Sequence, residues 1–116
     1  MLARTFVRFV LYATPLIFCA SPAPAAAQVE SWPWDALAAC ESNNQWQIDT
    51  GNGYRGGLQM TQLFWVDHGG LEFAARPDWA TRSEQIIVAI RGRDGTVGMW
   101  QGYYAWPTCA RRLGLI

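Results

Sequence analysis

The chain has 116 residues, which suits one domain, and nine basic residues balance nine acidic residues. Every basic residue is an arginine, and since no basic cluster is present, the composition argues against a nucleic-acid-binding protein. The seven tryptophans suit a hydrophobic core, and they also suit a groove that stacks on the flat faces of sugars.

The first 27 residues have the pattern of a signal peptide. Arg4 and Arg8 form a basic start, residues 9–20 are apolar over a length too short for a membrane span, and residues 25–27 offer an Ala-x-Ala cleavage site. We expect cleavage after Ala27, which leaves residues 28–116 as one secreted domain without a stable membrane anchor. An uncleaved anchor is the alternative. The mature domain would keep seven arginines against nine acidic residues, a formal charge of −2.

A helix is predicted over residues 34–42, because Leu and Ala favour helix and this segment contains no Gly or Pro. Ser31 can cap it. An apolar stripe at helical spacing (Trp34, Leu37, Ala38) ends at Glu41. The core-facing stripe and the negative end of the helix dipole both raise the pKa of a carboxyl there, as a general acid requires. A solvated residue at the helix end is the alternative interpretation of Glu41.

The glycine-rich residues 50–57 follow a short extended piece, residues 46–49. Asn52-Gly53 is a hairpin-turn signal, so an irregular two-stranded hairpin is predicted here. A second helix is expected over residues 58–68, ended by Gly69-Gly70.

An irregular loop is predicted over residues 71–80, before the capping box Thr81-Arg82-Ser83-Glu84. The capping box opens a helix through about Arg91, for which Ile86, Ile87 and Ile90 are the expected buried face. Residues 91–95 are predicted to form an exposed loop, and a short helix is expected over residues 97–104.

Two cysteines, Cys40 and Cys109, follow the predicted cleavage site. An even count in a short exported chain indicates a disulfide. The alternative is a catalytic cysteine paired with the single histidine, His68, which requires a free thiol outside the cell. Two cysteines and one histidine are too few for a closed zinc site, so no metal and no cofactor is predicted.

Several segments resemble the resuscitation-promoting-factor domain of actinobacteria, a transglycosylase-like and lysozyme-like family. The likeness covers about residues 32–113, and its motifs occur in the family's order. More distantly, the Glu-Ser and Gly-Leu-Gln elements are similar to those of soluble lytic transglycosylases. The segments that carry the likeness are Trp34–Ser42, Thr50–Gly53, Gly56–Gln59, Ala80–Ile86 and Ala105–Cys109.

The resemblance implies an α+β fold that is mostly α: a small lysozyme-like domain with a short irregular hairpin and one disulfide, Cys40–Cys109. It implies cleavage of peptidoglycan glycan strands, with Glu41 as the catalytic acid, and a role in cell-wall remodelling and in the resuscitation and growth of cells. It also implies a cell-wall-associated protein and a groove formed by the hairpin and by Gln101. The candidate substrate-binding residues are Thr50, Asn52, Tyr54, Gln59, Phe64 and Gln101.

Three departures from the family pattern concern the groove. Asn43-Asn44-Gln45 stands where the family has Gly-Gly-Asn, and Phe64 stands where it has Thr. Phe64 therefore replaces a polar contact by a stacking surface. Residues 93–99 form a segment that is several residues longer than usual, which alters a groove edge or a partner surface.

The favoured chemistry uses one carboxyl group, because neither Asp49 nor Asp67 has a strong case as a second. Glu41 would donate a proton and then act as base, which yields an anhydro sugar. Hydrolysis by water is the competing outcome. A glycan-binding module or secreted signal is the main alternative function, and a structural surface protein is a third. We expect a monomer, and relatives suggest a peptidoglycan endopeptidase as partner.

Overall fold

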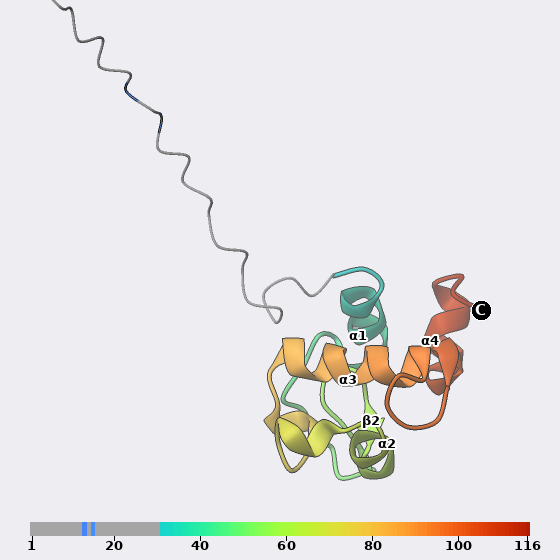
Figure 1. Ribbon diagram of the computed structural model, residues 1–116. Coiled ribbons are helices and arrows are strands. Elements are labelled where there is room, and N and C mark those ends of the chain that lie inside the picture. Colours follow the sequence, from blue (N-terminus) through green and yellow to red (C-terminus); the bar gives the residue numbers. More distant parts are fainter. Residues whose placement is uncertain (1–12, 14, 16–30) are drawn as a thin grey trace, which may run out of the picture.

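The computed structural model describes residues 13, 15 and 31–116, so the predicted signal peptide lies outside the described residues apart from two positions. The region from Ser31 onward folds as one domain, across which α3 runs (Figure 1). The helices and strands, in order, are α1 (Trp34–Ser42), β1 (Tyr54–Arg55), β2 (Met60–Thr61), α2 (Gln62–Asp67), the 3₁₀ helices η2 (Gly70–Glu72) and η3 (Pro77–Trp79), α3 (Arg82–Asp94), η4 (Gly102–Ala105) and α4 (Pro107–Arg112).

Helix α1 has the predicted bounds, and its apolar stripe is buried as expected at Trp34, Leu37 and Ala38. The predicted cap is wrong: Pro33 is the N-cap residue and no side chain caps the helix, while the backbone carbonyl of Ser31 accepts from Asp35 at 2.7 Å. The helix ends at Ser42, and Asn43 and Asn44 follow it with left-handed φ angles of 54° and 59°. Asparagine tolerates this conformation better than other non-glycine residues, which explains how it replaces the family's glycines.

The predicted hairpin is present, as the antiparallel pair β1 and β2 with Tyr54 opposite Thr61. Its turn lies at residues 56–59, however, and not at Asn52-Gly53. Asn52 instead reverses the chain inside a loop closed by the isolated bridge between Asp49 and Arg55, and its side chain accepts from the Tyr54 amide at 3.0 Å.

Helix α2 is shorter than predicted, because it starts at Gln62 rather than at residue 58. Gln59 has a φ of 50°, which a right-handed helix does not allow, and residues 60–61 pair with β1. The Thr61 side chain then caps the helix by accepting from the Phe64 amide at 3.1 Å. The predicted end is confirmed, since Gly69 has a φ of 76°.

Helix α3 opens with the predicted capping box, in which Thr81 and Glu84 bond each other's backbone amides. It continues to Asp94, three residues past the predicted end, and this contradicts the loop expected over residues 91–95. The buried face was predicted only in part: Ile86 is fully buried, Ile87 and Ile90 are half-buried, and the core positions are taken by Val88 and Ala89.

The short helix expected over residues 97–104 is absent. Residues 96–101 form a loop, η4 follows, and α4 starts at Pro107, where a helix tolerates a residue without an amide proton. Cys109 on α4 is bonded to Cys40 on α1, with the sulfurs 2.07 Å apart. The disulfide prediction is therefore confirmed, and the alternative of a free catalytic cysteine is wrong.

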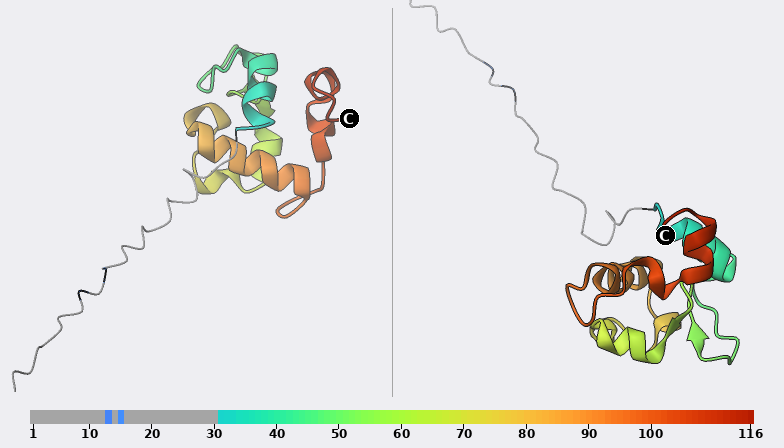
Figure 2. Two further views of the ribbon diagram at one scale, coloured as in Figure 1. Left: turned by 90° about the horizontal axis from the view of Figure 1, so that it is seen from above. Right: turned by 90° about the vertical axis from the view of Figure 1, so that its right-hand side faces the viewer.

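One hydrophobic cluster joins the elements. Side chains from α1, α2, α3 and α4 meet in it around Trp34, Trp65 and Trp106. Figure 2 (right) shows α4 beside α1, with the hairpin projecting below them. The fold is the predicted small α+β, mostly α, lysozyme-like domain. Across the described residues, every helix is too short or too polar to traverse a bilayer.

Candidate active site

Glu41 lies in the last turn of α1 and lines a cavity of about 340 Å³. This smaller cavity is bounded by the hairpin, by the start of α4 and by the disulfide, and Glu41 is its only acidic residue within the described part of the chain. Burial against these walls raises the pKa of the Glu41 carboxyl above its ordinary value. The side chain is therefore set up to carry a proton toward a bound group. The lining residues are Cys40, Glu41, Tyr54, Gln59, Ala105, Trp106, Pro107, Thr108, Cys109 and Arg112.

A larger cavity of about 510 Å³ adjoins the smaller one, because Tyr54, Gln59, Ala105 and Trp106 line both. The two cavities thus share one wall, and together they are called the groove below. The remaining residues of the larger cavity come from β2, α2 and the loop before η4: Met60, Thr61, Leu63, Phe64, Asp67, His68, Met99 and Gln101.

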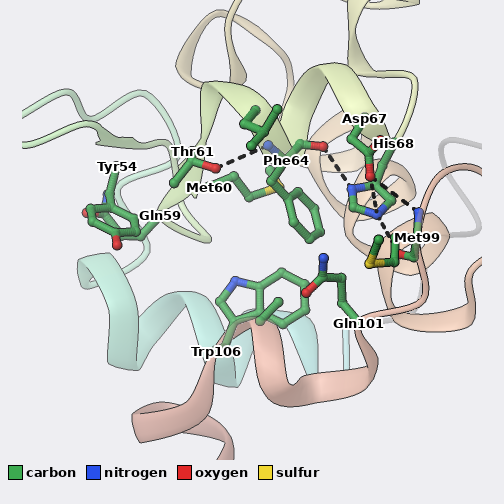
Figure 3. A pocket seen from close by; sticks show the side chains of 12 residues that line it. Tyr54, Gln59, Met60, Thr61, Phe64, Asp67, His68, Met99, Gln101 and Trp106 are labelled. Carbon is green, nitrogen blue, oxygen red and sulfur yellow. Dashed lines mark hydrogen bonds and ion pairs between the residues drawn. The ribbon is translucent and has the colours of Figure 1, made fainter.

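The floor of the larger cavity is apolar. The Phe64 ring lies between His68 and Trp106, with ring centroids 4.1 Å and 5.6 Å away (Figure 3). Leu63 and Met99 stand at the rim, 78% and 71% exposed. Phe64 thus offers an aromatic surface to the groove, with its ring held by packing on both sides.

His68 holds the wall of this cavity in place. It is fully buried, and its ring nitrogens lie 2.8 Å from the Phe64 carbonyl oxygen and 2.9 Å from that of Met99. The Asp67 carboxylate accepts from the Met99 amide at 3.3 Å. The loop that presents Met99 and Gln101 is therefore tied to α2. Nothing in the sequence pattern indicated this role for His68.

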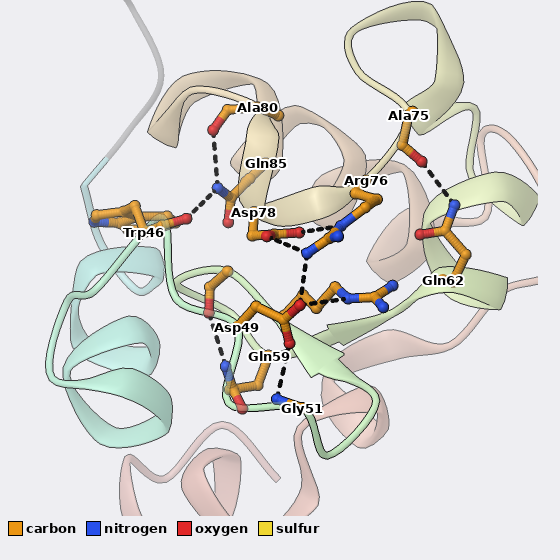
Figure 4. A network of polar contacts seen from close by, with 12 residues as sticks. Trp46, Asp49, Gly51, Gln59, Gln62, Ala75, Arg76, Asp78, Ala80 and Gln85 are labelled. Atoms are coloured by element: carbon orange, nitrogen blue, oxygen red, sulfur yellow. Dashed lines mark hydrogen bonds and ion pairs between the residues drawn. The ribbon is translucent and has the colours of Figure 1, made fainter.

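Two polar side chains fix the hairpin turn beside Glu41. Ser42 donates to the Gly57 carbonyl at 2.7 Å, and the Gly57 amide donates to the side-chain oxygen of the fully buried Gln85 at 3.0 Å. Gln85 also donates to the carbonyl oxygens of Trp46 and Ala80 (Figure 4). The amide and the carbonyl of Gly57 are thereby both held, which fixes the turn that leads to Gln59.

Asp49 and Asp67 lie away from Glu41. Asp49 is exposed, and a hydrogen bond from the Gly51 amide, helped by Arg55 and Arg76, lowers its pKa (Figure 4). Its contacts connect the hairpin loop to Arg76 at the start of η3. Asp67 lines only the larger cavity. Among the described residues, the smaller cavity thus offers Glu41 no second carboxylate.

The structure gathers five of the predicted site residues in the groove: Glu41, Tyr54, Gln59, Phe64 and Gln101. Thr50 and Asn52 are exposed in the loop before β1 and line neither cavity. Neither cavity includes Asn43 or Asn44. The sequence interpretation missed Trp106, which lines both cavities and donates to the Leu58 carbonyl at 2.8 Å. The Trp-Pro-Thr-Cys motif was the available signal.

Comparison with known proteins relates this chain to one family model and to several resuscitation-promoting factors. Residues 25–109 match the model of the transglycosylase-like domain family. The chain is 48% identical over 93 residues to resuscitation-promoting factor Rpf1 of Corynebacterium glutamicum, covering 80% of this chain and 46% of that protein. It is 46% identical over 94 residues to resuscitation-promoting factor Rpf of Micrococcus luteus, covering 80% and 38%.

A third relative is resuscitation-promoting factor RpfA of Mycobacterium tuberculosis H37Rv, 51% identical over 80 residues, with 69% of this chain and 18% of that protein covered. The chain thus spans between a fifth and a half of the length of these relatives. The family match covers the hairpin, both disulfide cysteines and every residue that lines the two cavities except Arg112. The chain belongs to the transglycosylase-like domain family, and its domain is a resuscitation-promoting-factor domain.

Proposed function

We propose that this domain cleaves the glycan backbone of peptidoglycan, between N-acetylmuramic acid and N-acetylglucosamine, as a lytic transglycosylase. One observation carries the proposal: a single half-buried carboxyl, Glu41, with a raised pKa, lines a groove bounded by Tyr54, Gln59 and Trp106. A glycan-binding module has little need for a buried carboxyl in its groove. The family match supports the same substrate.

In the proposed reaction, protonated Glu41 donates its proton to the glycosidic oxygen, and the bond from that oxygen to the anomeric carbon of N-acetylmuramic acid breaks. Positive charge develops at the anomeric carbon. The C6 hydroxyl of the same sugar then bonds to that carbon, and its proton returns to the Glu41 carboxylate. The products are a strand with an anhydro sugar end and a strand with a free hydroxyl, and Glu41 is again protonated.

The other groove residues bind and orient the strand. Tyr54 offers an exposed aromatic surface beside Glu41, the buried Trp106 supports the shared wall behind it, and Phe64 lies on the floor of the larger cavity. Gln59 and Gln101 supply amide groups for the hydroxyl and acetamido groups of the sugars. With Glu41 as the only carboxylate in the smaller cavity of the described chain, attack by the substrate's own hydroxyl is favoured over a base-activated water.

Secretion, action in the cell wall and promotion of growth belong to the same proposal. The signal-peptide pattern of residues 1–27 supports export, and the names of the relatives support a role in resuscitation. A monomer that works with a peptidoglycan endopeptidase remains our expectation.

The test is mass spectrometry of products from purified peptidoglycan, with the folded mature domain and its Glu41→Gln variant. Anhydro-muramyl products from the parent alone are expected. Reducing-end products would instead mean hydrolysis. Turnover by the folded Glu41→Gln variant would contradict the role of Glu41. Glycan binding without any product from the parent would favour the binding module.

A further inference from the structure

Five of the arginines in residues 31–116 are paired with carboxylates. The pairs are Arg55–Asp49, Arg76–Asp49 with Arg76–Asp78, Arg82–Asp35, Arg91–Glu72 and Arg93–Asp94. Within the same residues, Arg111 and Arg112 have no ion-pair partner. Both lie in the last turn of α4, but only Arg112 lines the smaller cavity with Glu41.

The Arg112 side chain is exposed at the rim of the cavity that Glu41 also lines. Its Nη1 is 4.0 Å from the Cys40 sulfur, and Cys40 directly precedes Glu41 in α1. Among the described residues the guanidinium forms no ion pair with Glu41, whose pKa is raised by burial. A positive group therefore faces the cavity without a negative partner from the described chain.

A guanidinium binds carboxylates in particular, through two parallel N–H donors. In a glycan of N-acetylmuramic acid and N-acetylglucosamine, the sugar rings are neutral. The lactyl ether of N-acetylmuramic acid is the exception, because it ends in a carboxyl group. That group is either free or joined by an amide bond to a stem peptide, which carries carboxylates of its own.

We propose that Arg112 is a specificity-determining residue, which binds a carboxylate of the N-acetylmuramic acid unit held beside Glu41. This inference rests on the proposed function, since it assigns part of the same groove to one chemical group of that substrate. The competing explanation is that Arg111 and Arg112 only offset the partial negative charge at the end of α4. That explanation applies equally to both arginines, whereas the proposal applies to Arg112 alone.

The experiment measures dissociation constants in the Glu41→Gln background, where strands are not consumed. Arg112→Gln is compared with the matched control Arg111→Gln, after thermal unfolding has shown that both are folded. The ligands are neutral N-acetylglucosamine oligosaccharides, strands stripped of peptides, which have free lactyl carboxylates, and strands with stem peptides. Arg112→Gln should raise the dissociation constant for stripped strands about tenfold, or about 1.4 kcal/mol. It should leave the neutral oligosaccharides within about twofold, and Arg111→Gln should leave every ligand within that range.

The ligands distinguish the two sources of a carboxylate. A loss confined to stripped strands identifies the lactyl carboxylate, and a loss confined to peptide-bearing strands identifies a carboxylate of the peptide. An equal loss on both shows that Arg112 binds the carboxylate in either position. Equal effects of the two substitutions, equal loss on neutral oligosaccharides, or no binding of either strand type would overturn the proposal. Failure of the proposed function looks different: the parent would leave peptidoglycan uncut, while Arg112 would still discriminate between charged and neutral strands.

Discussion

Gln85 lies at the centre of the support for the groove, and replacing it by leucine gives a direct measure of that support. The substitution removes three hydrogen bonds: from the Gly57 amide, and to the carbonyl oxygens of Trp46 and Ala80. The Ala80 carbonyl keeps a second donor, the side chain of Gln47 at 3.1 Å. The buried Gly57 amide and the partly buried Trp46 carbonyl therefore lose their partner, at a cost of about 1–3 kcal/mol each. Burial of the apolar leucine side chain offsets part of this cost, so the free energy of unfolding is expected to fall by about 2–4 kcal/mol.

Urea unfolding followed by far-UV circular dichroism, with the disulfide intact, checks this value. Gln47→Leu is the matched control, because it removes one partly buried bond and leaves Ala80 with its bond from Gln85. Its expected cost is below about 1 kcal/mol. The reasoning would be refuted if Gln85→Leu cost less than about 1 kcal/mol, or if the two variants lost equal stability.

Two further predictions concern the disulfide and the acid. Replacing Cys40 and Cys109 together by alanine should lower the unfolding free energy by about 4 kcal/mol, because the bridge closes a loop of 69 residues; unchanged urea unfolding would contradict this. Glu41→Gln should stabilise the fold at neutral pH. Burial raises the pKa of Glu41 in the folded state above the 4.5 of the free group. Between the pKa of the unfolded state and that of the folded state, the folded state binds more protons than the unfolded state, so the free energy of unfolding falls as the pH rises. The advantage of the variant should vanish at about pH 3, where both states are protonated, and urea unfolding at about pH 3 and pH 7 tests this.

Local rules predicted the elements that depend on local contacts. Helix α1 and the capping box of α3 follow from helix propensity and from a short motif, and both have the expected start. The position of Glu41 at the end of an apolar stripe followed from spacing alone. These features need no information about distant parts of the chain.

The wrong predictions concern segments whose conformation depends on contacts with distant parts of the chain. Residues 58–61 look helical, but pairing with β1 and the left-handed Gln59 draw them into the hairpin. The loop before η4 follows its contacts with α2, through Met99, His68 and Asp67. Arg112 reaches the cavity only because α4 lies beside α1. No local pattern contains that information.

The two sides of the smaller cavity come from opposite ends of the domain. Glu41 belongs to the first helix, whereas Ala105, Thr108 and Arg112 belong to the last two helical elements. A ribosome adds residues from the N-terminus, so the acid is made early and its enclosing wall is made last. Nascent chains that lack α4 would hold Glu41 in an open setting, where water keeps its carboxyl ionised. The burial that raises the pKa of Glu41 therefore depends in part on residues that are synthesised last.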